Sequence, residues 1–124
     1  MSRYMLLLYA PDTDEAGAAA RWAELPEWAE VTRGLQQAGV LVDNSALRPV
    51  DTATTVRVRE GDTTLTDGPF AVTKEILAGY YLLDCADLDE AVRAAARLPM
   101  ARYGSIEVRP VMTESDLPEV GAAG

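Results

Sequence analysis

The chain of 124 residues contains no histidine, and this absence excludes more chemistry than any other feature of the sequence. Histidine-based catalytic triads, the common zinc sites and a neutral imidazole base are all ruled out. Acid–base chemistry would therefore rely on carboxylates, tyrosines, lysine or a bound water, with pKa values shifted by burial. The chain also lacks a glycine-rich phosphate loop and the acidic spacing of a metal-binding loop, so we expect no cofactor and no metal.

Basic residues and long apolar runs are also scarce. Eleven lysines and arginines stand against twenty acidic residues, which gives a formal net charge of −9. Binding to nucleic acid or to anionic membranes depends on basic side chains, so we expect neither as a direct partner. No apolar run approaches the twenty residues of a membrane-spanning helix, and we expect none.

A single cysteine, Cys85, cannot form an internal disulfide bond. The apolar run at residues 4–10 is not typical of an export signal, so we expect a cytoplasmic protein. Cys85 ends an apolar strand pattern and lies near Asp84 and Asp87 in the sequence. This setting predicts a buried thiol whose thiolate form is disfavoured.

The length fits one domain, which we assign to residues 1–112, followed by an acidic, alanine- and glycine-rich tail over residues 113–124 that we expect to be poorly ordered. Apolar residues at helical or alternating spacing place the elements. We predict strands over residues 4–9, 54–59, 63–66, 79–83 and 105–111, the start of a short strand at 40–42, and helices over residues 25–38, 70–77 and 88–98.

Two successive strand–helix–strand units predict an α+β fold, a ferredoxin-like sandwich with two helices on one face and an added β-hairpin. The strands at residues 4–9 and 80–83 are apolar on both alternating faces, a pattern typical of strands that are buried on both sides. Two helices cover only one face of the sheet. We therefore expect a second copy of the chain to cover the other face, which makes a homodimer.

The most distinctive segment is Asp67-Gly68-Pro69-Phe70, which precedes Lys74, the only lysine. Gly68 can adopt a positive φ and Pro69 has a fixed φ, so we predict a stiff turn that opens the short helix at 70–77. In a cleft, Asp67 would be a proton acceptor and Lys74 an anchor for an anionic group. Alternatively, Asp67 is an ordinary helix cap and Lys74 belongs to a solvated helix face.

Five further side chains are candidates for binding a substrate. Tyr9, Trp28 and Tyr80 would line an apolar pocket between helix and sheet, and Arg57 and Arg109 would supply its charges. The alternative is that the aromatic rings pack in the core and that the arginines lie at solvent-facing strand edges.

Three stretches together resemble the DGPF branch of the YCII-related family: Arg3-Tyr4-Met5-Leu6-Leu7, residues 66–75, and Glu107-Val108-Arg109-Pro110-Val111. The resemblance covers residues 3–112 and implies a dimeric α/β barrel. In members of the wider family, a histidine and an aspartate are proposed to form a catalytic dyad. The corresponding positions fall near Trp28 and Leu98 in this chain. The dyad is therefore absent here, and its mechanism does not transfer. The DGPF branch also usually has glutamate where this chain has Val72.

These observations support two main functions. The first is a protein that binds a small organic molecule and carries out cofactor-free proton transfer, of the isomerase or lyase kind, by analogy with dimers of this fold. The second, implied by the resemblance, is a non-enzymatic accessory or regulatory module associated with an alternative sigma factor. A third possibility is an accessory dimer whose pocket is filled by its own side chains.

Overall fold

The computed structural model describes residues 1–119, so the part of the predicted tail at residues 120–124 lies outside the described residues. The strands are β1 (Ser2–Pro11), β2 (Leu41–Ala46), β3 (Thr54–Arg59), β4 (Asp62–Asp67), β5 (Glu75–Cys85) and β6 (Ser105–Pro110). The helices are α1 (Glu15–Trp22), α2 (Leu25–Gln37) and α3 (Leu88–Arg97), joined by short 3₁₀ turns at Val50–Thr52, Pro99–Arg102 and Glu114–Asp116.

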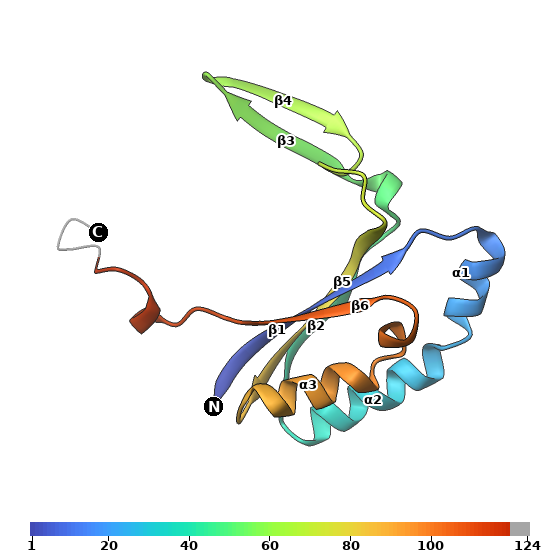
Figure 1. The fold of residues 1–124 in the computed structure, drawn as a ribbon, viewed down its shortest axis with the longest axis vertical. Helices are drawn as coiled ribbons and strands as arrows, with labels where there is room; N and C mark the ends of the chain where they lie inside the picture. Colours follow the sequence, from blue (N-terminus) through green and yellow to red (C-terminus); the bar gives the residue numbers. More distant parts are fainter. Residues whose placement is uncertain (120–124) are drawn as a thin grey trace.

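Four strands form an antiparallel sheet in the order β2-β5-β1-β6, and β3 and β4 form a separate hairpin. Helices α2 and α3 lie together on one side of the four-stranded sheet (Figure 1). This arrangement confirms the predicted α+β fold, with the strand order of a ferredoxin-like sandwich. The hairpin is an insertion between β2 and β5, and its strands begin and end within one residue of the predicted positions.

The core lies between the sheet and the helices. From Tyr4 onward in β1 and from Gly79 onward in β5, every second residue is buried and faces α2 and α3. The ring of Trp28 on α2 stacks on that of Tyr81, with centroids 6.3 Å apart, and Thr32 shares a 2.7 Å hydrogen bond with the Tyr81 hydroxyl. The buried core side chains of the two strands are Tyr4, Leu6, Leu8, Ala10, Tyr81, Leu83 and Cys85.

The opposite side of the sheet, here called the open face, is not covered by any helix of residues 1–119 (Figure 1). The other alternating residues of β1 and β5 point to this side and are only half-buried. Its central apolar side chains are Met5, Leu7, Tyr9, Tyr80 and Leu82.

Helix α3 contacts the core through small side chains. Ala91, Ala94 and Ala95 are buried, whereas Leu88 and Val92 are 49% and 47% exposed. The apolar spacing that predicted a helix over residues 88–98 would also bury Leu88 and Val92, and in this respect the pattern is misleading. Three closely spaced alanines let the helix approach the sheet directly, and this contact turns the two larger side chains away from the core.

Two local predictions were wrong: one helix was not predicted, and one predicted helix does not form. Residues 15–22, for which no helix was predicted, form α1. Its cap is Asp14, whose side chain accepts a 2.9 Å hydrogen bond from the Gly17 amide. Residues 70–77, expected to be a helix, form a turn followed by the start of β5. Residues 75–77 pair with residues 9–11 of β1, and these long-range hydrogen bonds override the local helix-start signal.

A bulge in β5 changes the direction of its side chains. Gly79 is opposite Leu8 and Leu77 is opposite Tyr9, so Ala78 is the extra residue. A single inserted residue reverses the alternation of the strand on one side of it. Leu77 therefore lies on the open face with Tyr80, although simple alternation would place them on opposite faces.

Gly79→Ala is expected to destabilise the fold by about 1–3 kcal/mol, the usual cost of overpacking. A Cβ atom at this position would lie 2.6 Å from the carbonyl oxygen of Ser45 in β2, and a backbone atom has little freedom to move away. The free energy of unfolding in urea measures the loss. Gly34→Ala is the matched control, because its new Cβ meets only the flexible end of Arg97, at 3.4 Å. Equal stability of the two variants would contradict the close approach of β2 to β5.

Candidate functional site

A cleft of about 590 Å³ lies between the base of the β3–β4 hairpin and one end of the four-stranded sheet. Its walls come from the two connections that join the hairpin to the sheet, together with the adjoining ends of β3 and β5, over residues 47–55 and 69–77, and from Tyr9 of β1. The site is thus built where the inserted hairpin leaves the core fold.

Backbone hydrogen bonds hold both walls. The Leu47 amide donates to the Ala78 carbonyl at 2.8 Å, which fastens the first connection to the bulge of β5. On the second connection, Gly68 has a φ of 97°, a conformation that favours glycine, and its amide donates to the Ala53 carbonyl at 2.7 Å. Pro69 follows directly. The predicted stiff turn is therefore present, but it leads into a strand and not into a helix.

The lining of the cleft is mainly apolar, with Leu47, Val50, Ile76 and Leu77 among its side chains. The hydroxyls of three lining threonines are used within the protein, since they donate to backbone carbonyls of Pro49, Gly68 and Glu75. The cleft therefore offers a mostly apolar surface to a ligand, with few polar groups free to orient it.

Two charged side chains line the cleft. Arg48 is exposed and forms no ion pair with any residue in the range 1–119. Glu75 is half-buried, and its Oε1 accepts a 2.7 Å hydrogen bond from Oγ of Ser105 on β6. This bond restricts the Glu75 carboxylate while leaving acceptor positions free. The arrangement can pair a carboxylate of a ligand with Arg48 and present Glu75 as a proton acceptor.

The structure separates the two residues predicted to be catalytic from this cleft. Asp67 is the last residue of β4, where it pairs with Thr54, and it is exposed. It is not a helix cap, because no helix begins after it. Lys74 is exposed in the turn before β5. Neither side chain is among those that line the cleft.

The five predicted binding residues are dispersed. Tyr9 lines the cleft. Arg57 lies on β3 and donates to the Phe70 carbonyl at 3.3 Å, so it ties the hairpin to the second connection. Trp28 packs on the helix side of the sheet, whereas Tyr9 and Tyr80 lie on the open face. The sheet therefore separates these rings, and the predicted pocket between helix and sheet does not unite them.

Tyr80 and Arg109 both lie on the open face, outside the cleft. The Tyr80 hydroxyl donates a 2.6 Å hydrogen bond to Oδ2 of Asp43 on β2, and this bond raises the pKa of Tyr80. Arg109 on β6 is exposed, with its Nε 4.0 Å from Oε2 of Glu107. These polar pairs border the apolar centre of the open face.

The sequence offered little signal for the residues that do line the cleft. Glu75 and Leu77 reach it because the bulge at Ala78 changes the alternation of β5, and such a bulge has no clear pattern in this sequence. Arg48 lies in a connection without periodicity. Pro49 is typical of a bend, but a bend alone does not show which side chains converge on it.

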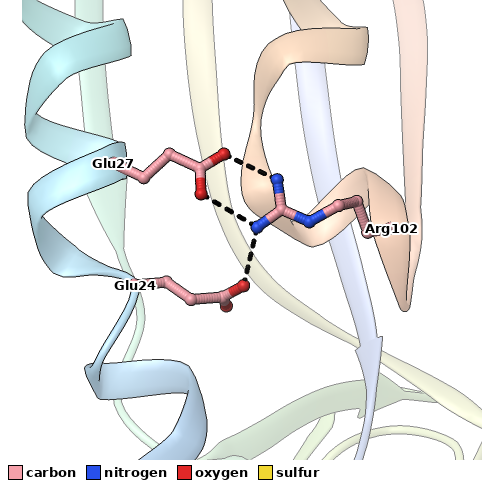
Figure 2. A network of polar contacts seen from close by, with 3 residues as sticks. All are labelled: Glu24, Glu27 and Arg102. Carbon is pink, nitrogen blue, oxygen red and sulfur yellow. Dashed lines mark hydrogen bonds and ion pairs between the residues drawn. The ribbon is translucent and has the colours of Figure 1, made fainter.

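A separate charged network joins the start of α2 to the 3₁₀ turn at Pro99–Arg102 (Figure 2). Arg102, in the 3₁₀ turn before β6, donates to both carboxylate oxygens of Glu27 at 2.6 and 3.0 Å and to Glu24 at 2.9 Å. These bonds lower the pKa of Glu27. Because the guanidinium is already shared by two carboxylates of the same chain, this network serves to fasten α2 and is not a ligand site.

Cys85 is fully buried at the end of β5, as predicted. Burial raises the pKa of its thiol, and the carboxylates of Glu90 and Asp84 raise it further. Within residues 1–119, no cluster of three or more cysteine or acidic side chains is suited to holding a metal ion. In the same part of the chain, no helix has the length and apolar character needed to cross a membrane.

Comparison with known proteins shows which family the chain matches. The model of the YCII-related domain family matches residues 2–115. The chain is also similar to an uncharacterized protein of Rhizobium meliloti (strain 1021), with 48% identity over 83 residues that cover 65% of this chain and 67% of the relative.

Proposed function

The chain belongs to the YCII-related domain family, and from this premise we propose that it is a small cytoplasmic homodimer that binds a small organic acid in the cleft beside the hairpin. The cleft of about 590 Å³ is the observation that carries the proposal. The turn at Asp67-Gly68-Pro69-Phe70, which builds one wall, supports placing the chain in the DGPF branch of the family.

The open face supports the homodimer. Met5, Leu7 and Leu82 form an apolar strip along two central strands of the sheet, and no helix in the described part of the chain covers this side. Sheets with apolar residues on both faces are normally covered on both. A two-fold axis through this face would bring two sheets together as a dimeric α/β barrel. Light scattering at micromolar concentration should then give twice the chain mass of 13.4 kDa, and a mass of one chain would contradict the dimer.

The lining supports the ligand class. Apolar side chains suit the body of a small aromatic or aliphatic molecule, and Arg48 suits one carboxylate group. Glu75 would remove a proton from the bound molecule and return it at another atom, which isomerises the molecule without a cofactor. Tyr9 and Leu77 lie both in the cleft and on the open face, so the cleft opens toward the proposed second copy.

We expect a small carboxylate to raise the melting temperature of the wild-type protein, because a ligand that binds only the native state stabilises it. The measurement is a thermal-shift series with benzoate, phenylacetate and hexanoate, with benzamide as the uncharged comparison. Arg48→Gln should remove the shift, whereas Asp67→Ala, outside the cleft, should retain it. If the rise in melting temperature is instead lost in Asp67→Ala and kept in Arg48→Gln, the ligand binds at the turn around Asp67 and not in the cleft.

A second candidate is a non-enzymatic accessory module that binds an alternative sigma factor. The exposed Leu88 and Val92, one turn apart on the outer side of α3, favour a protein partner, and the acidic charge of the chain suits a basic one. If no carboxylate shifts the wild type while a purified sigma factor binds it and does not bind Val92→Asp, this second function replaces the first.

A further inference from the structure

The β3–β4 hairpin, here called the arm (residues 54–67), carries three uncovered apolar side chains. Val56, Val58 and Leu65 are 60%, 56% and 69% exposed. Val56 pairs directly with Leu65 in the hairpin register, and Val58 lies two residues further along the same strand. All three therefore lie on one side of the ribbon, which we call the apolar face of the arm.

Few contacts hold the arm to the rest of the chain. Within residues 1–119, neither of its strands pairs with the four-stranded sheet. Its attachments are at its base, where Oγ1 of Thr55 donates to the Gly68 carbonyl at 2.8 Å and Arg57 donates to the Phe70 carbonyl. Both donors belong to the side of the ribbon opposite the apolar face. An isolated two-stranded ribbon is marginally stable in water, so this uncovered face calls for a partner.

The position of the arm indicates what that partner is. In Figure 1 the arm rises on the side of the sheet away from α2 and α3, which is the side of the open face. A second copy of the chain placed against the open face would therefore stand next to the arm. A foreign protein would have to share this space with that copy.

The area that a stable interface needs also supports a second copy of the chain as the partner of the arm. A standard protein–protein interface buries about 800 Å² on each partner. The central side chains of the open face are already half-buried within their own chain, so they supply only part of that area. The three side chains of the arm are more exposed than these, and they add apolar area next to the open face.

We propose that the apolar face of the arm packs on the second copy of the chain, so that each protomer holds the other with its arm. This inference rests on the proposed homodimer. By the two-fold symmetry the contact forms twice, and the arm and the open face become parts of one continuous interface.

Hydrogen exchange tests the proposal on the full chain. Amide protons of residues 54–67 should exchange at least about tenfold more slowly in the wild-type dimer than in a Leu82→Glu monomer, because packing on the partner suppresses local opening. Amides of α3 serve as the internal control and should be equally protected in both. Equal exchange of the arm in dimer and monomer would overturn the proposal. A wild-type mass of one chain would instead show that the homodimer itself is wrong.

A matched pair of arm variants gives an independent readout. Val58→Asp places a charge on the apolar face, and Thr64→Asp places the same charge on the opposite side of the ribbon, beside Arg57. Val58→Asp should raise the dimer dissociation constant at least about tenfold, whereas Thr64→Asp should leave it unchanged. Equal dissociation constants would show that the arm is free of the second copy and available to a different protein.

Discussion

Leu82→Glu is expected to convert the dimer into a folded monomer. Leu82 lies on the open face, opposite Met5 of β1 and Asp43 of β2. In a face-to-face dimer the new carboxylate would lose its water next to another acidic group, and burying an unpaired charge costs several kcal/mol. The two-fold axis doubles this cost. Since each 1.4 kcal/mol is a factor of about ten in affinity, dissociation should be complete at micromolar concentration.

The fold should survive this change, because in the single chain position 82 borders solvent. Light scattering gives the mass, and circular dichroism shows whether the secondary structure is retained. Val92→Glu is the matched control: it introduces the same charge on the exposed outer side of α3 and should leave the dimer intact. If Leu82→Glu remains dimeric, the sheets do not meet through the open face.

Leu83→Ala, one residue further along β5, should instead destabilise the fold strongly. Leu83 points to the helix side and is fully buried between the sheet and the helix layer. Removing a buried leucine side chain costs about 2–5 kcal/mol, through lost burial and the cavity left behind. A domain has a total stability of only about 5–15 kcal/mol, so this one change removes a large part of it.

Urea denaturation at a fixed protein concentration measures the effect, since the stability of a dimer depends on concentration. Leu88→Ala provides the same substitution at an exposed position of α3 and should change the stability by no more than about 0.5 kcal/mol. The folded fraction of Leu83→Ala should keep the mass of the wild type. A loss no larger than that of Leu88→Ala would contradict the assignment of Leu83 to the core.

Much of the fold was predictable because its signals are local. The apolar spacing of residues 25–38 predicted α2, which spans Leu25–Gln37, and Gly39 just after its end has the positive φ that commonly ends a helix. The alternation at 54–59 predicted the first strand of the hairpin, and Glu60 and Gly61, where the chain turns back, both have positive φ. Asp87 caps α3, and its side chain accepts a 2.9 Å hydrogen bond from the Glu90 amide.

The candidate site was less predictable, because it depends on register. Tyr9 was predicted to be a binding residue from its position on the first strand, and it does line the cleft. Glu75 and Leu77 reach the cleft only through the bulge that separates them from Tyr80. Asp67 belongs to the distinctive turn at residues 67–70 and Lys74 follows it, and Pro69 and Phe70 of that turn do line the cleft. The side chains of Asp67 and Lys74, however, lie outside it.

By itself, the sequence determined the absence of histidine chemistry, the positions of most strands and helices, and the left-handed turn at Gly68. Each of these depends on residue type or on periodicity over a few positions. Only the tertiary structure decided that residues 75–77 extend β5 in place of a helix, that the bulge at Ala78 turns Glu75 into the cleft, and that the apolar face of the arm remains uncovered. Those outcomes depend on hydrogen bonds between segments more than sixty residues apart, or on the lack of any neighbour, and neither is encoded in a local pattern.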